Sequence, residues 1–97
     1  MSRRLIALLL AVLPLFAQKQ PPSDNYIYDQ VRIRLSADVE VKGANLAIAV
    51  KEGVVTIKGF VETDKARQKA EKIAKKVKGV RSVVNELKVD TTKARTT

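Results

Sequence analysis

Four lysines, Lys65, Lys69, Lys72 and Lys76, follow one another at intervals of four, three and four residues. This spacing places them on one face of a helix, where a row of ammonium groups attracts anions such as lipid headgroups. Each lysine near an acidic membrane contributes ~1 kcal/mol, so four give ~4 kcal/mol, which corresponds to roughly millimolar binding. Charge alone is therefore too weak to hold the protein on a membrane. The simpler interpretation of the row is a solvated helix face.

A second contribution to membrane binding is available from Tyr26 and Ile33, nearer the N-terminus. Both belong to a predicted helix, and neither falls on its apolar stripe. Arg34 lies between this pair and the stripe. An exposed aromatic and an exposed isoleucine beside a cation suit a lipid interface or a partner protein. The alternatives are that a flanking segment covers them, or that they are exposed without a role.

Catalytic and metal-binding chemistry finds no support in the sequence. The chain has no Cys and no His, which removes thiolates, the commonest general base and the commonest metal ligand. Its ten Asp and Glu residues are scattered over predicted caps, loops and helix surfaces, without spacing for acid–base work or for a transition metal. No loop has the spacing of a Ca²⁺ site. We expect no enzyme activity, no metal, no cofactor and no small-molecule substrate.

The charge of the chain favours anionic partners, since 19 Lys and Arg stand against 10 acids and give a net charge of +9. Lipid headgroups, nucleic acid and acidic proteins all satisfy this condition. Nucleic acid is the weakest of the three, because the chain lacks a GxxG loop and lacks aromatics on a strand for base stacking. Export, argued below, also removes the opportunity. We therefore expect no nucleic-acid partner.

The patterns that position these residues predict five elements. Ile27, Val31 and Leu35, with Tyr28 at the edge of the same face, predict a helix over residues 26–38, capped by Ser23, Asp24 or Asn25. Alternation over residues 46–50 and 54–61, with a short turn between them, predicts a β-hairpin. A second helix, capped by Thr63 or Asp64, has this apolar face: Ala66, Ala70, Ile73, Ala74 and Val77.

Gly79 follows this second helix and is expected to be its left-handed C-cap, and residues 80–89 are the last strand. The order helix, strand, strand, helix, strand predicts a single small αββαβ domain of the α+β class. Its three-stranded mixed sheet is covered by both helices on one face, which buries every apolar stripe. The strand order within the sheet does not follow from these residues.

The chain divides into a leader, a linker, the domain and a tail. Residues 1–17 are expected to be a cleaved signal peptide, because Arg3 and Arg4 precede a short apolar run. The alternative is an uncleaved membrane anchor, although the run is shorter than the ~20 residues of a spanning helix. Residues 18–25 are assigned as a linker, residues 26–90 as the domain and residues 91–97 as a flexible tail.

The folded part resembles the BON domain family, small modules of bacterial envelope proteins. The resemblance is carried by residues 48–50, residues 53–61, Ala70, residues 73–74 and residues 79–89. It implies an exported protein that binds partners, often phospholipid membranes, and that can use its first helix on lipid. The glycine of the family falls on Gly59, inside a strand pattern, where it serves a bulge, a positive φ or a close approach of a helix.

Together these observations predict a non-catalytic binding module that is periplasmic or otherwise exported, and peripheral on a membrane. We expect it to bind anionic phospholipid surfaces of the cell envelope. The alternative is an interaction or scaffold module that docks onto an envelope protein complex or associates with itself. The expected binding residues are Tyr26, Ile33, Arg34, Lys65, Lys69, Lys72 and Lys76, with Gly59 and Gly79 in structural roles.

Overall fold

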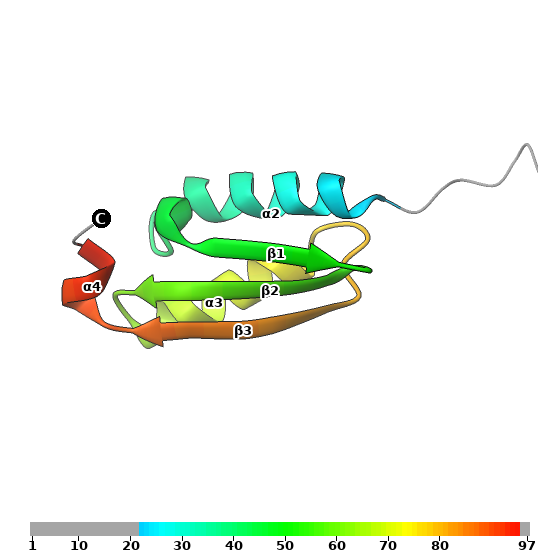
Figure 1. Cartoon of the computed structure of the whole chain (residues 1–97). Helices are drawn as coiled ribbons and strands as arrows, with labels where there is room; N and C mark the ends of the chain where they lie inside the picture. Colours follow the sequence, from blue (N-terminus) through cyan, green and yellow to red (C-terminus); the bar gives the residue numbers. More distant parts are fainter. Residues whose placement is uncertain (1–21, 96–97) are drawn as a thin grey trace, which may run out of the picture.

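The elements follow the order expected for an αββαβ domain, with one further helix at the C-terminal end (Figure 1). The computed structural model describes residues 22–95, so the expected signal peptide and residues 18–21 of the expected linker lie outside them. The elements are α2 (Asp24–Ala37), η1 (Gly43–Asn45), β1 (Ala47–Lys51), β2 (Val54–Val61), α3 (Asp64–Lys75), β3 (Ser82–Val89) and α4 (Thr91–Arg95).

Helix α2 begins at Asp24, two residues before the predicted start, because the Ser23 hydroxyl accepts a hydrogen bond from the amide of Tyr26 at 3.1 Å. Ile27, Val31 and Leu35 are fully buried and form the side of α2 that faces the core. Tyr28 lies at the edge of this face, as predicted: it is about 20° from Leu35 around the helix, and it is 37% exposed.

The sheet has the order β1-β2-β3, with β1 and β2 antiparallel and β2 and β3 parallel. This confirms the mixed sheet and supplies the strand order. The central strand contributes Val55, Ile57 and Val61 to the core. The statement that no aromatic lies on a strand was wrong, because Phe60 belongs to β2 and is 37% exposed. In Figure 1 the helix α3 passes behind β2 and β3, so the side of the sheet turned to the viewer is the one opposite α3.

Three small residues bring α3 close to the sheet: Ala66, Ala70 and Ala74 are all buried, and the helix is capped by the Thr63 hydroxyl. The assignment of Gly79 as the C-cap was wrong. The helix ends at Lys75 with Lys76 as its cap, and Gly79 lies in the turn that follows. Its φ of +96° and the contact that a Cβ would make with Pro22 at 2.9 Å explain the glycine.

Gly59 also has a positive φ, +132°, so of the three expected uses the positive φ is the one observed. A Cβ there would meet the far end of the Leu46 side chain at 2.9 Å, and the next contacts are at 3.5 and 3.7 Å. The neighbour is thus a loop side chain rather than a helix, and the backbone conformation is the stronger requirement for glycine.

The description of residues 91–97 as a flexible tail was wrong for residues 91–95, which form α4. The Thr91 hydroxyl donates to the Glu62 carbonyl at 3.2 Å, and the Arg95 guanidinium contacts the Glu62 carboxylate at 2.8 Å. A five-residue helix is not stable by itself. These contacts with a residue far away in sequence hold α4 in place.

Candidate functional site

The two long helices lie side by side and run in opposite directions. The end of α2 contacts the middle of α3 through Asp38 and Lys69, while Pro22 and Ile27 lie beside Gly79, just after α3. An open groove of about 370 Å³ separates them and is lined by Arg34, Ala37, Asp38, Ile73 and Lys76. The exposed side of α2 and the lysine side of α3 therefore border the same groove.

We call this surface the helical face. It is defined by Tyr26, Ile33 and Arg34 of α2 together with Lys65, Lys69, Lys72 of α3 and the α3 cap Lys76. The apolar members are well exposed, since Tyr26 keeps 43% and Ile33 keeps 60% of its surface in contact with solvent. They are seven residues apart, which is about 10 Å along the helix axis. A flat surface can touch both at once.

The lysine row does not act as one unit, because two of its members are held by acids from the loop after α2. Lys69 Nζ lies 3.0 Å from an Asp38 carboxylate oxygen and 2.9 Å from one of Glu40. Lys65 Nζ lies 3.4 Å from the other Glu40 oxygen. Two lysines and two acids thus neutralise one another at the end of the helical face.

The ionisation of this cluster follows from the same contacts. The hydrogen bond from Lys69 lowers the pKa of Asp38, and the amides of Val41 and Glu40 lower it further. Hydrogen bonds from Lys69 and then Lys65 lower the pKa of Glu40. The pKa of Lys69 is raised by Glu40 and Asp38 in turn. Asp38, Glu40 and Lys69 therefore stay charged near neutral pH.

The remaining cations of the helical face are Arg34, Lys72 and Lys76. Within residues 22–95 none of the three forms an ion pair or a hydrogen bond through its side chain, and all three are exposed. Arg34 and Lys76 line the groove between the helices. The part of the predicted site that is free to contact an external anion is thus reduced from five cations to three.

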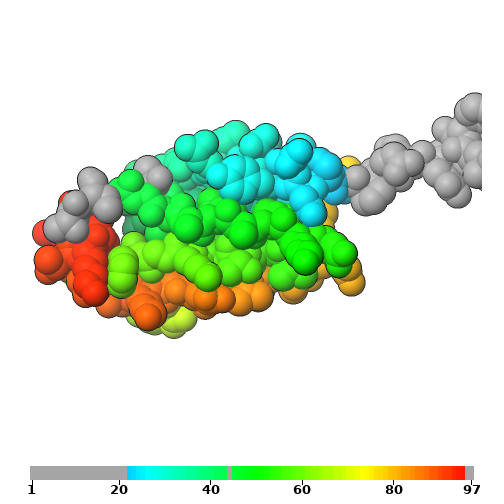
Figure 2. Space-filling model, in the orientation of Figure 1, coloured from blue at the N-terminus to red at the C-terminus, as the bar shows by residue number. Residues whose placement is uncertain are grey.

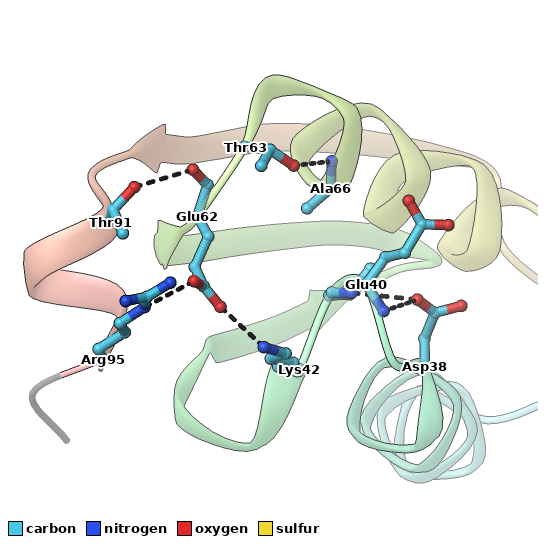
Figure 3. Close-up of polar contacts among 9 residues, drawn as sticks. Asp38, Glu40, Lys42, Glu62, Thr63, Ala66, Thr91 and Arg95 are labelled. Carbon is cyan, nitrogen blue, oxygen red and sulfur yellow. Dashed lines mark hydrogen bonds and ion pairs between the residues drawn. The ribbon is translucent and has the colours of Figure 1, made fainter.

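Sequence reasoning missed Glu62, which organises the same end of the domain as the cluster around Glu40 (Figure 3). Its carboxylate accepts from Lys42 at 3.0 Å and from Arg95 at 2.8 Å, and these cations lower its pKa, Lys42 more than Arg95. The partners are 20 and 33 residues away in sequence. No local pattern could have indicated this junction between the loop before β1 and α4.

Two further polar side chains with structural roles were also missed. Asp24 accepts hydrogen bonds from the amides of Glu52 and Gly53 at 2.8 and 3.0 Å, which ties the start of α2 to the hairpin turn. Asn85 donates to the Arg67 carbonyl of α3 at 2.9 Å and accepts from the amide of Leu87 at 3.1 Å. Asp24 thus fastens α2 to the hairpin, and Asn85 fastens β3 to α3.

In the described part of the chain, no three His, Cys, Asp or Glu side chains gather in a way that could hold a metal ion. Among the same residues, no helix has the length and apolar character needed to cross a membrane.

The fold and the helical face define a class: a small α+β binding module with basic, partly apolar helices on one side of its sheet. The family model of the BON domain matches residues 23–91, so the chain belongs to the BON domain family. It is also similar to the osmotically-inducible protein Y of Escherichia coli strain K12, with 35% identity over 65 residues. The match covers 67% of this chain and 32% of that relative.

The chain therefore spans about a third of the length of the curated protein it matches. Membership of this family identifies the domain as an envelope-associated binding module.

Proposed function

We propose that this protein binds peripherally to anionic phospholipid surfaces in the periplasm, through its helical face. The observation that carries the proposal is a group of three cations, Arg34, Lys72 and Lys76, that have no ion-pair partner among residues 22–95. They lie beside the exposed side chains of Tyr26 and Ile33. A surface with this composition offers both contributions that peripheral binding needs, electrostatic attraction and burial of apolar groups.

The magnitudes support reversible binding. Three free cations contribute ~3 kcal/mol at an acidic membrane. Tyr26 and Ile33 would each add on the order of 1–2 kcal/mol when they leave water. The sum of ~5–7 kcal/mol corresponds to a dissociation constant of roughly 10–200 μM. Neither contribution alone reaches this range, so removal of either should be easily measured.

Co-sedimentation with vesicles tests the proposal. The full chain is mixed with vesicles of neutral lipid, and with vesicles that contain anionic lipid, at low and at high salt. We expect binding only to the anionic vesicles, and we expect salt to weaken it because the Debye length is ~10 Å at 0.1 M. The proposal is wrong if the folded protein ignores anionic vesicles at low salt. In that case the docking of the helical face onto a protein takes its place.

Two variants separate the contributions. The triple variant Arg34→Gln/Lys72→Gln/Lys76→Gln should weaken binding and flatten the salt dependence. The double variant Tyr26→Ser/Ile33→Ser should weaken binding and leave the salt dependence nearly intact. A matched control removes three cations from elsewhere, Lys51, Lys58 and Lys88 on the sheet. It changes the net charge equally, and it should lose much less affinity if the helical face is the contact surface.

A further inference from the structure

The domain has a second broad surface, the side of the sheet that faces away from α2 and α3 (Figures 1 and 2). We call it the open sheet face; it consists of the outward side chains of β1, β2 and β3. The register places Ala49, Thr56 and Val84 in one row across the three strands. Val84 is 42% exposed and Phe60, farther along β2, is 37% exposed. Because Ala49, Thr56 and Val84 have short side chains, the centre of this face is flat and largely apolar.

Lysines stand at both ends of this apolar centre. Lys51 lies in the row of Val54 at one end, and Lys88 pairs in register with Phe60 at the other. Within residues 22–95 neither lysine forms an ion pair. Lys58 and Glu86 face each other at 3.8 Å, and both side chains are about half exposed or more, so this pair is weak. Three lysines against one acid give the outward side chains of the strands a net charge of +2. Lys93 of α4 adds a further cation, which lies 5.0 Å from the centre of the Phe60 ring.

We propose that the open sheet face is a docking surface for an acidic protein partner. The apolar centre fits an apolar patch on that partner, and Lys51 and Lys88 fit carboxylates at the rim of the patch. This is the arrangement of a protein interface, with an apolar middle and a charged rim that sets specificity.

The charges and the side-chain lengths on the open sheet face favour an acidic protein over two other partners, a second copy of the chain and a membrane. A second copy of the chain would bring one face of charge +2 against another, and like charges in an interface are unfavourable. A membrane would require side chains long enough to enter the acyl boundary, which lies ~5–10 Å below the headgroups. Ala47, Ala49 and Val84 are too short for this, and the longer Phe60 side chain has the Lys93 ammonium group 5.0 Å from the centre of its ring. An acidic protein satisfies both conditions.

The position of the face adds a functional consequence. The helical face and the open sheet face lie on opposite sides of the sheet. A domain that rests on a membrane with its helices therefore presents the open sheet face to the surrounding compartment. Membrane contact and partner contact can then occur at once. The docking surface does not depend on the proposed membrane binding, because it is built from different residues.

Site-specific photo-crosslinking in the host cell tests this proposal. A photoreactive amino acid replaces Val84 in the full chain, and a control chain carries it at Ser36, an exposed residue of α2. We expect an adduct with an acidic protein from Val84 that is absent from Ser36. The captured protein is then purified, and its dissociation constant is measured by calorimetry against the full chain and two folded variants with equal charge change.

The double variant Lys51→Glu/Lys88→Glu should weaken the purified complex roughly tenfold or more, because both rim contacts become repulsive. The matched variant Lys72→Glu/Lys76→Glu on the helical face should change it less than threefold. The proposal is overturned by the absence of a Val84 adduct, by an adduct with lipid or with a second copy, or by equal sensitivity to the two variants. Vesicle binding of Lys51→Glu/Lys88→Glu is measured in parallel, so failure of membrane binding is recognised separately.

Discussion

Replacement of Gly59 separates two explanations of why a glycine stands inside β2. Its φ of +132° is strained for any residue with a Cβ, and such strain costs ~1–3 kcal/mol. The steric contact is less costly, because the only atom closer than 3.5 Å is the terminal Cδ2 of Leu46, which can rotate away. The strain begins with the first carbon of a side chain. We therefore expect Gly59→Ala and Gly59→Val to destabilise the domain by similar amounts.

Thermal unfolding followed by circular dichroism measures the effect. For a domain of this size ~1 kcal/mol lowers the melting temperature by about 4–8 °C, so each variant should melt roughly 5–20 °C lower. Leu46→Ala provides the control for the steric explanation, since a clash would be relieved in the double variant Gly59→Val/Leu46→Ala. A wild-type melting temperature for Gly59→Ala, or a full rescue by Leu46→Ala, would refute the argument from backbone strain.

Three other predictions follow from the polar contacts. Glu40→Gln frees Lys65, while Lys69 keeps its ion pair with Asp38. It should tighten binding to anionic vesicles by up to roughly fivefold, whereas Glu86→Gln, with the same charge change, should not. Because the pKa values of Asp38, Glu40 and Glu62 are lowered, their contacts stabilise the fold above the ordinary carboxyl range and are lost as the pH falls through the lowered values. The melting temperature should thus be flat from pH 7 to about 5 and fall below about 4, and Glu62→Gln should reduce the fall. Asn85→Ala should destabilise the domain by ~1–3 kcal/mol in denaturant titrations, since the Leu87 amide loses its acceptor and β3 loses its hydrogen bond to the Arg67 carbonyl of α3. A loss below about 0.5 kcal/mol would mean that neither bond matters.

The same Asn85 illustrates how edge strands are protected. Alternate amides of a strand in a parallel pair point to opposite sides, and Asp90 donates to Val61 of β2 at 2.9 Å. The amide of Leu87, three residues earlier, therefore points to the free edge of β3, where the Asn85 side chain accepts its hydrogen bond. An occupied donor cannot pair with a strand of another molecule. Asn85→Ala should also increase self-association, which gel filtration can detect.

Much of the fold could be predicted because its signals are local. The spacing of Ile27, Val31 and Leu35 determines which side of α2 is buried, and the Thr63 hydroxyl caps a helix that begins one residue later. The alternation in the two hairpin strands likewise fixes which side of each strand is buried. Each of these features depends on residues within one or two turns of each other.

The site could be predicted only in part, because its charges are paired across long distances in sequence. Spacing places Lys69 in a row of lysines, but its partner Glu40 is 29 residues away and meets it only after α3 has packed beside α2. The helix at residues 91–95 likewise depends on Glu62, 33 residues before Arg95. Periodicity shows which side of a helix a charge occupies, but it does not show which opposite charge the fold places there.

The central claim, that the helical face binds anionic membranes, is tested most directly by vesicle co-sedimentation of the full chain beside the variant Arg34→Gln/Lys72→Gln/Lys76→Gln. We predict that the wild type sediments with anionic vesicles at low salt and is released as salt rises. The variant, folded by circular dichroism, should remain largely in the supernatant, while the control that removes Lys51, Lys58 and Lys88 should still sediment. Equal sedimentation of the wild type and the helical-face variant, or no sedimentation of the wild type, would contradict the claim.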